Sequence, residues 1–401
     1  MQASASSSRT SKSKRARYPL LAVSLTLVFV TVWFQSAALR LAVPYLLAFD
    51  EEATIGDNGL SGGNDPMLSS QSAHAFPGEN RFDRFRHDQI PLLDLVNDDP
   101  GRNCTDGFVL VRDSGRELLA DGISYGSTTR RIPKIIHMTT KSRCMLQQFA
   151  DNIDRWRFQN YTVLIHDDEA VAKLMDHYFP EFPELQKAAQ CVLSGAGKAD
   201  LWRAVVLWEY GGIYTDIDNA PTRMFNNGSA ISDDDEAWFV IEKGGWLSQY
   251  FWASTHHHPI NYLVVSKIIQ RMYTLSNVEA QYIPRSTGPG ALKWAFIDFM
   301  RNSGGNYYEG GKCKDYKSKY DTVLAGHYTG WDNWTVTAVG KKEKSNWYIM
   351  RNSVRFKGAI YKEMNMTHFQ DFVRNETVES CFERIYNRDK WSASHGRDDR
   401  H

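Results

Sequence analysis

The sequence predicts an α/β domain, in which helices cover both faces of a β-sheet. From Arg131 to about residue 300, short runs rich in β-branched and aromatic residues alternate with longer runs of helical period. The composition, 42% hydrophobic and 23% charged, is typical of a globular protein. The formal net charge is zero, so we expect no nucleic-acid partner. The 401 residues suffice for one large domain with appendages.

The N-terminal region has the pattern of a membrane anchor. Residues 1–17 carry five Lys or Arg and no acid, and residues 18–39 carry no charge. As a helix, the uncharged run would measure about 33 Å, enough for a ~30 Å hydrocarbon layer. The positive-inside rule makes 1–17 a cytosolic tail and 18–39 a transmembrane signal anchor, with the remainder lumenal or extracellular. A cleaved signal peptide is the alternative, but its apolar region is usually only ~7–15 residues long.

The remaining chain suits an oxidising lumen. All five cysteines follow the predicted anchor, and two disulfides could pair them in fifteen ways. Cys191 lies in a helical pattern and is expected to be a buried free thiol. Six glycosylation sequons also follow the anchor: Asn103, Asn160, Asn227, Asn333, Asn365 and Asn375.

Three regions follow the anchor. Residues 40–128 are expected to form a flexible lumenal stem, because 53–78 are rich in Gly, Ser, Asn and Asp without a hydrophobic period. Within this region, a short helix in 81–96 is expected to dock on the domain. Residues 129–340 form the predicted domain. Residues 341–401 show no usable pattern and are assigned as its C-terminal extension, partly disordered at the end.

The domain's elements follow from periodicity and turn residues. The first half should contain a strand at 131–138, a helix at 144–158, a strand leading into a helix at 161–179, helices at 183–193 and 198–210, and a strand at 212–218. The second half should contain strands at 237–242 and 250–254, helices at 258–272 and 288–300, and a strand at 321–326. Gly211 is predicted to stop the helix before the strand at 212–218.

Two aspartates near the end of the strand at 212–218 suggest a ligand site. Alternation along a strand places Tyr214, Asp216 and Asp218 on one face, at the edge where open α/β sheets bind ligands. Carboxylates ligate Mg²⁺, Mn²⁺ or Ca²⁺, and an incomplete shell is commonly filled by substrate phosphates. This favours a nucleotide-diphosphate donor. The second Asp-x-Asp pair, Asp233 and Asp235, is expected in a solvated loop.

The helix before this strand carries Asp200 and Arg203, three residues apart on one face. A surface ion pair is one interpretation. Their position immediately before the acidic strand favours a role at the ligand site. The turn at 286–291 is either an ordinary helix start or a phosphate-binding turn.

Two segments of the predicted domain resemble a known family. The segments 198–221, "KADLWRAVVLWEYGGIYTDIDNAP", and 131–141, "RIPKIIHMTTK", resemble glycosyltransferase family 32. This family contains the sugar-binding region with a DXD motif and includes Golgi initiation-specific α-1,6-mannosyltransferases. The resemblance implies a GT-A type nucleotide-diphospho-sugar transferase fold, a Rossmann-like mixed sheet flanked by helices. It also implies a Mn²⁺ or Mg²⁺ cofactor and transfer from a nucleotide sugar with retention of configuration.

The resemblance also implies roles for individual residues. Asp200 and Arg203 would hold the donor sugar beside Tyr214. Asp216 would contact the ribose, sugar or metal, and Asp218 would ligate the metal. The implied catalytic residues are therefore Asp216, Asp218 and Arg203. The end of the first strand, near His137, would line the nucleotide pocket, and the segment "GHYTGW" would supply His327 to the metal and Trp331 to the diphosphate. The family's "QTW" is replaced by Met138, Thr139 and Thr140, which leaves the donor open.

These observations predict a single-pass type II Golgi membrane glycosyltransferase. It would move a hexose, with mannose from GDP-mannose as the first candidate, onto a glycan or glycolipid acceptor. Alternatives are UDP-galactose or UDP-N-acetylglucosamine as donor and a sphingolipid as acceptor. A non-catalytic, lectin-like protein that binds calcium and sugar is a candidate from a different class. A phosphatase of the haloacid-dehalogenase type is disfavoured, because Ala220 stands where it needs Thr or Val.

Overall fold

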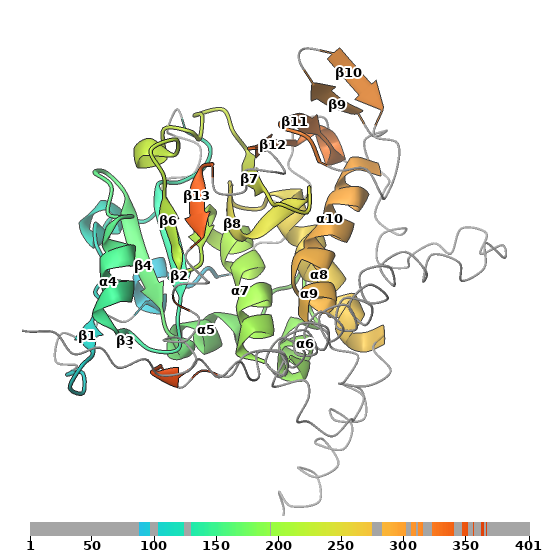
Figure 1. Cartoon of the computed structure of the whole chain (residues 1–401). Coiled ribbons are helices and arrows are strands. Elements are labelled where there is room, and N and C mark those ends of the chain that lie inside the picture. Colours follow the sequence, from blue (N-terminus) through green and yellow to red (C-terminus); the bar gives the residue numbers. More distant parts are fainter. Residues whose placement is uncertain are drawn as a thin grey trace, which may run out of the picture. The chain divides into compact units, whose positions relative to one another are not determined.

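A mixed β-sheet of nine strands forms the centre of the computed structural model (Figure 1). The structure describes residues 88–96, 103–123, 130–192, 194–274, 283–301, 306–309, 312–315, 323–340, 347–351, 356, 362–364 and 366. The predicted anchor at 18–39 lies outside these residues. Within the described ranges, no helix has the length and apolar character that crossing a membrane requires.

The strand order across the sheet is β10-β9-β11-β12-β7-β8-β5-β2-β4. β2 pairs in parallel with β4 and β5, and β12 with β7, whereas β8 is antiparallel to both of its neighbours. The strands are β2 (Ile135–Thr139), β4 (Thr162–His166), β5 (Gly212–Thr215), β7 (Ala237–Ile241), β8 (Leu247–Ser254), β9 (Asn306–Glu309), β10 (Lys312–Asp315), β11 (Gly326–Thr329) and β12 (Thr335–Val339).

Helices cover both faces of the sheet, which confirms the predicted α/β class. One apolar core lies between the sheet and α5 (Asp168–Met175), α6 (Leu185–Cys191), α7 (Gly195–Tyr210), α8 (Pro259–Thr274) and α10 (Pro289–Arg301). A second core packs α4 (Gln147–Asp154) against the opposite face. The shorter elements are α3 (Leu92–Leu95), β1 (Val109–Leu110), η2 (Arg116–Leu119), β3 (Cys144–Met145), β6 (Asn219–Pro221), η3 (Asn226–Gly228), α9 (Ile283–Ser286), η5 (Trp331–Asn333) and β13 (Ile349–Arg351).

The central helix α7 leads directly into β5. It begins at Ser194, whose Oγ accepts a hydrogen bond from the Gly197 amide at 3.0 Å. It ends at Gly211, which has a φ of +63°, and Gly212 follows with a φ of +100°. A Cβ on Gly211 would lie 2.6 Å from the His256 amide nitrogen, and one on Gly212 would lie 2.7 Å from the Ile135 carbonyl oxygen. This turn therefore requires glycine at both positions, and the predicted helix stop at Gly211 is confirmed.

The predicted elements are mostly confirmed, with differences at their ends. The helix predicted at 144–158 is shorter, because Cys144 and Met145 form β3 and α4 covers Gln147–Asp154. The strand predicted at 212–218 ends at Thr215, because pairing of β5 with β8 stops there. The strand predicted at 321–326 is wrong: residues 323–325 are not extended in the sheet, and β11 begins at Gly326.

The last part of the predicted stem belongs to the folded domain, which corrects the stem boundary at 128. As expected, a short helix, α3, docks there: Leu92 and Leu95 are buried in the first core. The Tyr210 hydroxyl donates a hydrogen bond to the Ile90 carbonyl at 2.8 Å. Further along, β1 pairs with β3, and a disulfide joins Cys104 to Cys144. Buried leucines in 88–96 explain why this segment folds.

The expectation of a free thiol at Cys191 is wrong. Cys191 is fully buried, as its helical pattern indicated, but it is disulfide-bonded. Its partner is outside the side chains that the structure describes. Sequence spacing does not show which cysteines meet, so the pattern revealed the burial of Cys191 and not its oxidation.

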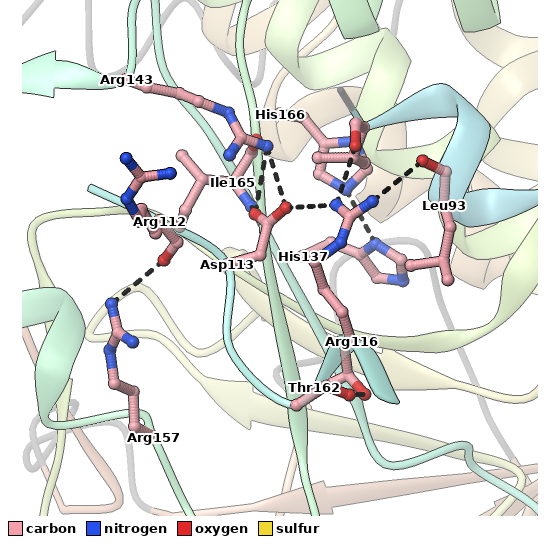
Figure 2. A network of polar contacts seen from close by, with 12 residues as sticks. Leu93, Arg112, Asp113, Arg116, His137, Arg143, Arg157, Thr162, Ile165 and His166 are labelled. Atoms are coloured by element: carbon pink, nitrogen blue, oxygen red, sulfur yellow. Dashed lines mark hydrogen bonds and ion pairs between the residues drawn. The ribbon is translucent and has the colours of Figure 1, made fainter. Parts of the chain in front are cut away.

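A buried cluster of charged side chains fixes residues 88–96 and 103–123, which were predicted to be stem, to the sheet. Figure 2 shows the Asp113 carboxylate between the guanidinium groups of Arg116 and Arg143. Arg116 Nη1 lies 2.7 Å from Asp113 Oδ2, and Arg143 Nη2 lies 3.1 Å from both carboxylate oxygens. The Ile165 amide of β4 also donates to Asp113 Oδ1 at 2.9 Å, and Arg116 Nη1 donates to the Val96 carbonyl at 2.8 Å. One carboxylate thus ties 88–96 and 103–123 to β4.

We expect Asp113→Asn to lower the free energy of unfolding by about 3 kcal/mol, because it leaves the buried Arg143 guanidinium without its anion. Urea unfolding measures the loss. Asp154→Asn is the matched control, since its ion pair with Arg157 is exposed and should change stability by less than about 0.5 kcal/mol. An equal loss of unfolding free energy in the two variants would contradict a stabilising role for the buried Asp113 ion cluster.

Candidate functional site

The two motif aspartates lie in a tight turn after β5, which corrects the prediction that they share one strand face. The Asn219 amide donates to the Asp216 carbonyl at 3.0 Å and closes the turn. The Asp216 amide and Asn219 Nδ2 both donate to the Tyr250 carbonyl of β8, at 3.0 and 2.8 Å. The turn follows the C-terminal end of β5, the edge predicted for ligand binding.

The structure brings together four of the predicted donor-binding residues. Arg203 Nη2 lies 3.1 Å from Asp200 Oδ1 and 3.6 Å from Asp216 Oδ1. The Tyr214 hydroxyl donates to Asp216 Oδ1 at 2.6 Å, and the Arg203 guanidinium carbon is 4.4 Å from the centre of the Tyr214 ring. Asp200 and Arg203 therefore form a buried pair at the turn and not a surface ion pair.

Two further residues hold this group in place. Arg203 Nη1 donates to the Gln249 carbonyl at 2.7 Å, and Gln249 Nε2 donates to the Thr287 carbonyl at 2.8 Å. The Thr287 hydroxyl donates to Asp200 Oδ2 at 2.9 Å. Thr287 is fully buried just before α10, so this turn supports the acidic group through its side chain. Sequence reasoning noted the turn but missed this contact, and it missed Gln249 entirely.

Burial sets the charge state of the two acids that face the interior. It raises the pKa of Asp200 to about 6, against the opposing effects of Arg203 and the Thr287 hydrogen bond. Burial, reinforced by the charge of Asp216, raises the pKa of Asp218 to about 7, and Arg351 opposes the rise. The charge of Asp216 thus destabilises the ionised form of Asp218 unless a cation lies between the two carboxylates.

The geometry at Asp218 fits a divalent metal ion. Asp218 is 9% exposed, and its Oδ1 is buried without a hydrogen-bond partner among the described residues. A buried carboxylate oxygen without a donor is a high-energy arrangement that a cation would relieve. The adjacent Asp216, whose side chain is 29% exposed, could share the ion. Both are hard oxygen ligands suited to Mn²⁺ or Mg²⁺.

The structure does not bring the three predicted metal ligands together, because His327 lies away from Asp216 and Asp218. The described residues contain no group of three His, Cys, Asp or Glu side chains that could hold a metal ion. His327 is exposed on β11, where its Nδ1 lies 2.9 Å from Thr337 Oγ1. β11 is four strands from β5 in the sheet order, about 19 Å at the usual strand spacing. The resemblance located the motif but not its place in the sheet.

His137 and Trp331, predicted to contact the donor, are enclosed in the protein interior. His137 is fully buried: its Nε2 donates to the Gly211 carbonyl at 3.0 Å, and its Nδ1 lies 3.1 Å from His166 Nε2. Burial lowers the pKa of His137 to about 4, so the ring is neutral. Trp331 is 4% exposed and packs edge-on against Tyr262 of α8. Direct donor contacts by these two side chains stay predictions, since Tyr214, in the predicted donor-binding group, is buried to a similar extent at 1% exposed.

The second Asp-x-Asp pair is structural. The Asp233 side chain is 61% exposed, in agreement with a solvated loop. Asp235 is buried, which corrects the same expectation for this residue. It accepts hydrogen bonds from the Ser232 amide at 2.6 Å and from the Thr337 hydroxyl at 2.5 Å.

One cation at the site comes from the region without a sequence pattern. β13 pairs with β6 in antiparallel register, so Arg351 lies opposite Asn219. The Arg351 guanidinium carbon is 4.1 Å from the centre of the Tyr250 ring. No signal in 341–401 indicated this residue, because only the pairing of two distant segments brings it to the turn.

Comparison with known proteins confirms the resemblance. Residues 129–237 match the family model described as a glycosyltransferase sugar-binding region containing a DXD motif. This segment contains Asp200, Arg203, Tyr214, Asp216 and Asp218.

Relatives of low identity carry related names. HOC1, a proposed glycosyltransferase of Saccharomyces cerevisiae, is 25% identical over 39% of this chain and 43% of its own length. The initiation-specific alpha-1,6-mannosyltransferase of Schizosaccharomyces pombe is 26% identical over 42% of this chain and 49% of its own. Inositol phosphoceramide mannosyltransferase 1 of the same yeast is 22% identical over 50% and 61%. The chain thus spans about half the length of these relatives.

Among solved structures, the PaToxG glycosyltransferase matches with 18% identity and a TM-score of 0.32, over 42% of this chain and 69% of its own. The comparisons therefore support a glycosyltransferase with mannosyltransferase relatives, chiefly through residues 129–237.

Burial of Asp218 predicts a pH dependence of stability. Its pKa rises from 3.8 to about 7 on folding, so the folded state holds a proton that the unfolded chain releases. The metal-free protein should therefore lose stability as the pH rises from about 4 to 7. Asp218→Asn removes this titration. We therefore compare the free energies of unfolding of the variant and the natural protein at two pH values. We expect the difference, variant minus natural protein, to be about 2 kcal/mol more positive at pH 8 than at pH 5.

Urea unfolding of both proteins at the two pH values measures this difference. Mn²⁺ at pH 8 should stabilise the natural protein and leave Asp218→Asn unchanged. A gain that is the same at both pH values would show that the Asp218 carboxyl does not titrate as its burial indicates.

Proposed function

We propose that this chain is a retaining, metal-dependent glycosyltransferase of the GT-A type that moves a hexose from a nucleotide sugar to a glycan or glycolipid. The observation that carries the proposal is the grouping of Asp200, Arg203, Tyr214 and Asp216 beside Asp218, whose buried Oδ1 has no hydrogen-bond partner among the described residues. This grouping lies within the segment that matches the DXD sugar-binding region.

Each residue has a chemical task in this proposal. Asp218, with Asp216, would hold Mn²⁺ or Mg²⁺, which when bound supplies positive charge to the departing diphosphate. Arg203 keeps its guanidinium against Asp200 and Asp216 and would orient the donor sugar through its N–H groups. Asp200, fixed by Thr287, can accept hydrogen bonds from sugar hydroxyls. Retention needs no separate carboxylate base if a phosphate oxygen of the leaving group takes the acceptor's proton.

GDP-mannose is the first candidate donor. Two of the matching relatives are named as mannosyltransferases, one of them specific for inositol phosphoceramide. These names support mannose as the sugar, and either a glycan or a sphingolipid as the acceptor. UDP-galactose and UDP-N-acetylglucosamine remain alternative donors. The basic segment 1–17 and the uncharged segment 18–39 support a type II anchor, with the domain in the Golgi lumen.

A donor panel with the purified full-length chain and Mn²⁺ tests the proposal. We expect hydrolysis or transfer with GDP-mannose in preference to UDP-sugars. Binding of sugar and metal without turnover of any donor would instead identify a lectin-like protein.

With the preferred donor, we expect Asp218→Ala to lower kcat/KM by about 10²–10³-fold, because the charge that neutralises the diphosphate is no longer held in place. Asp233→Ala, which removes an exposed acid from the second Asp-x-Asp pair, is the matched control and should retain full activity. Full manganese-dependent transfer by Asp218→Ala would refute the metal assignment.

A further inference from the structure

The C-terminal strand β13 brings a cation to the aspartate turn. Figure 1 shows β13 beside β6, which immediately follows this turn. Besides the register that sets Arg351 opposite Asn219, the Thr222 amide donates to the Tyr348 carbonyl at 2.9 Å. The Thr222 hydroxyl donates to the Trp347 carbonyl at 2.7 Å. The position of Arg351 is therefore fixed by backbone pairing on the residues that follow Asp218.

Arg351 and the aspartate turn are built on the same residue, Tyr250. The Tyr250 carbonyl accepts from the Asp216 amide and Asn219 Nδ2, while its ring lies under the Arg351 guanidinium. Tyr250 is 4% exposed, and its hydroxyl has no hydrogen-bond partner among the described residues. With Asp218 Oδ1, two buried polar atoms beside this turn lack a hydrogen-bond partner among the residues that the structure describes. Such atoms mark a place that a polar ligand would fill.

A diphosphate at the aspartate turn would need a positively charged side chain in addition to Arg203. The charge of Asp216 acts on both Asp218 and Glu242, and all three carboxylates would repel a diphosphate. Arg203 is held against Asp200 and Asp216. Arg351 acts on both Asp218 and Glu242 and is exposed, so a ligand can reach it. A guanidinium presents paired N–H donors that match two oxygens of a phosphate group.

We propose that Arg351 binds the diphosphate of the donor, and that β13 therefore forms part of the donor site. This inference rests on the proposed function, since it assumes a nucleoside diphosphate at the aspartate turn. It assigns Arg351 as a ligand-binding residue, with Tyr250 beneath it as a support. It also gives a role to the region after residue 340, which carried no recognisable motif.

Calorimetric titration of the full-length chain in Mn²⁺ tests the inference, with GDP and UDP each compared with its nucleoside. We expect Arg351→Gln to weaken binding of the preferred diphosphate by about 10–100-fold, since one charge-assisted contact is lost. Binding of the nucleoside should stay unchanged. Arg351→Lys keeps the charge without the paired donors, so we expect a smaller loss. Arg301→Gln, at the exposed end of α10, is the control and should bind normally.

The possible failures are distinguishable. If the natural protein binds neither diphosphate, the proposed function fails and this inference with it. If the natural protein binds a diphosphate and Arg351→Gln binds it equally well, the inference alone fails. An equal loss of nucleoside and diphosphate binding would also overturn it, because Arg351 would then act only on the fold. Should Arg351→Gln not fold, Arg351→Lys decides: a loss for the diphosphate and not for the nucleoside supports the inference, and no loss overturns it.

Discussion

The repulsion between two carboxylates in a buried turn is the constraint on which the site depends. Asp216 and Asp218 are two positions apart in the sequence, and burial together with the charge of Asp216 disfavours the ionised form of Asp218. The protein offsets part of this cost with Arg203, which the helix α7 holds against Asp216. Gly211 and Gly212 connect α7 to β5 and so place the aspartates after the helix. Thr287 and Gln249 hold the Asp200 and Arg203 side chains of α7 in position. The turn therefore folds with part of its negative charge uncompensated, and this charge favours binding of a cation.

The sequence predicted the local part of this arrangement well. Periodicity identified the longer helices and strands between Arg131 and Arg301, and Gly211 marked the end of α7, because these signals depend on near neighbours along the chain. Asp200, Arg203, Tyr214 and Asp216 were grouped correctly for the same reason, since one helix and the strand after it carry all four. The strand face assigned to Asp216 and Asp218 was wrong, because the length of β5 is set by its partner β8.

Contacts between distant segments could not be predicted. The resemblance predicts a metal ligand at His327, but the sheet order places β11 four strands from β5. Arg351 and Thr287 were missed because nothing near them in the sequence indicates their partners. Residues 88–96 and 103–123 are within the predicted stem, yet the Asp113 cluster and the Cys104–Cys144 disulfide hold them on the domain. In each case the deciding information is a pairing across the fold.

The pairing of β6 with β13 has a consequence for biosynthesis. The Thr222 hydroxyl and the Trp347 carbonyl are 125 residues apart in sequence. At a synthesis rate of about 5–20 residues per second, the ribosome needs roughly 6–25 s to add that many residues. During this interval the residues of the aspartate turn have been synthesised but those of β13 have not, so these acidic residues lack the β13 strand while synthesis continues.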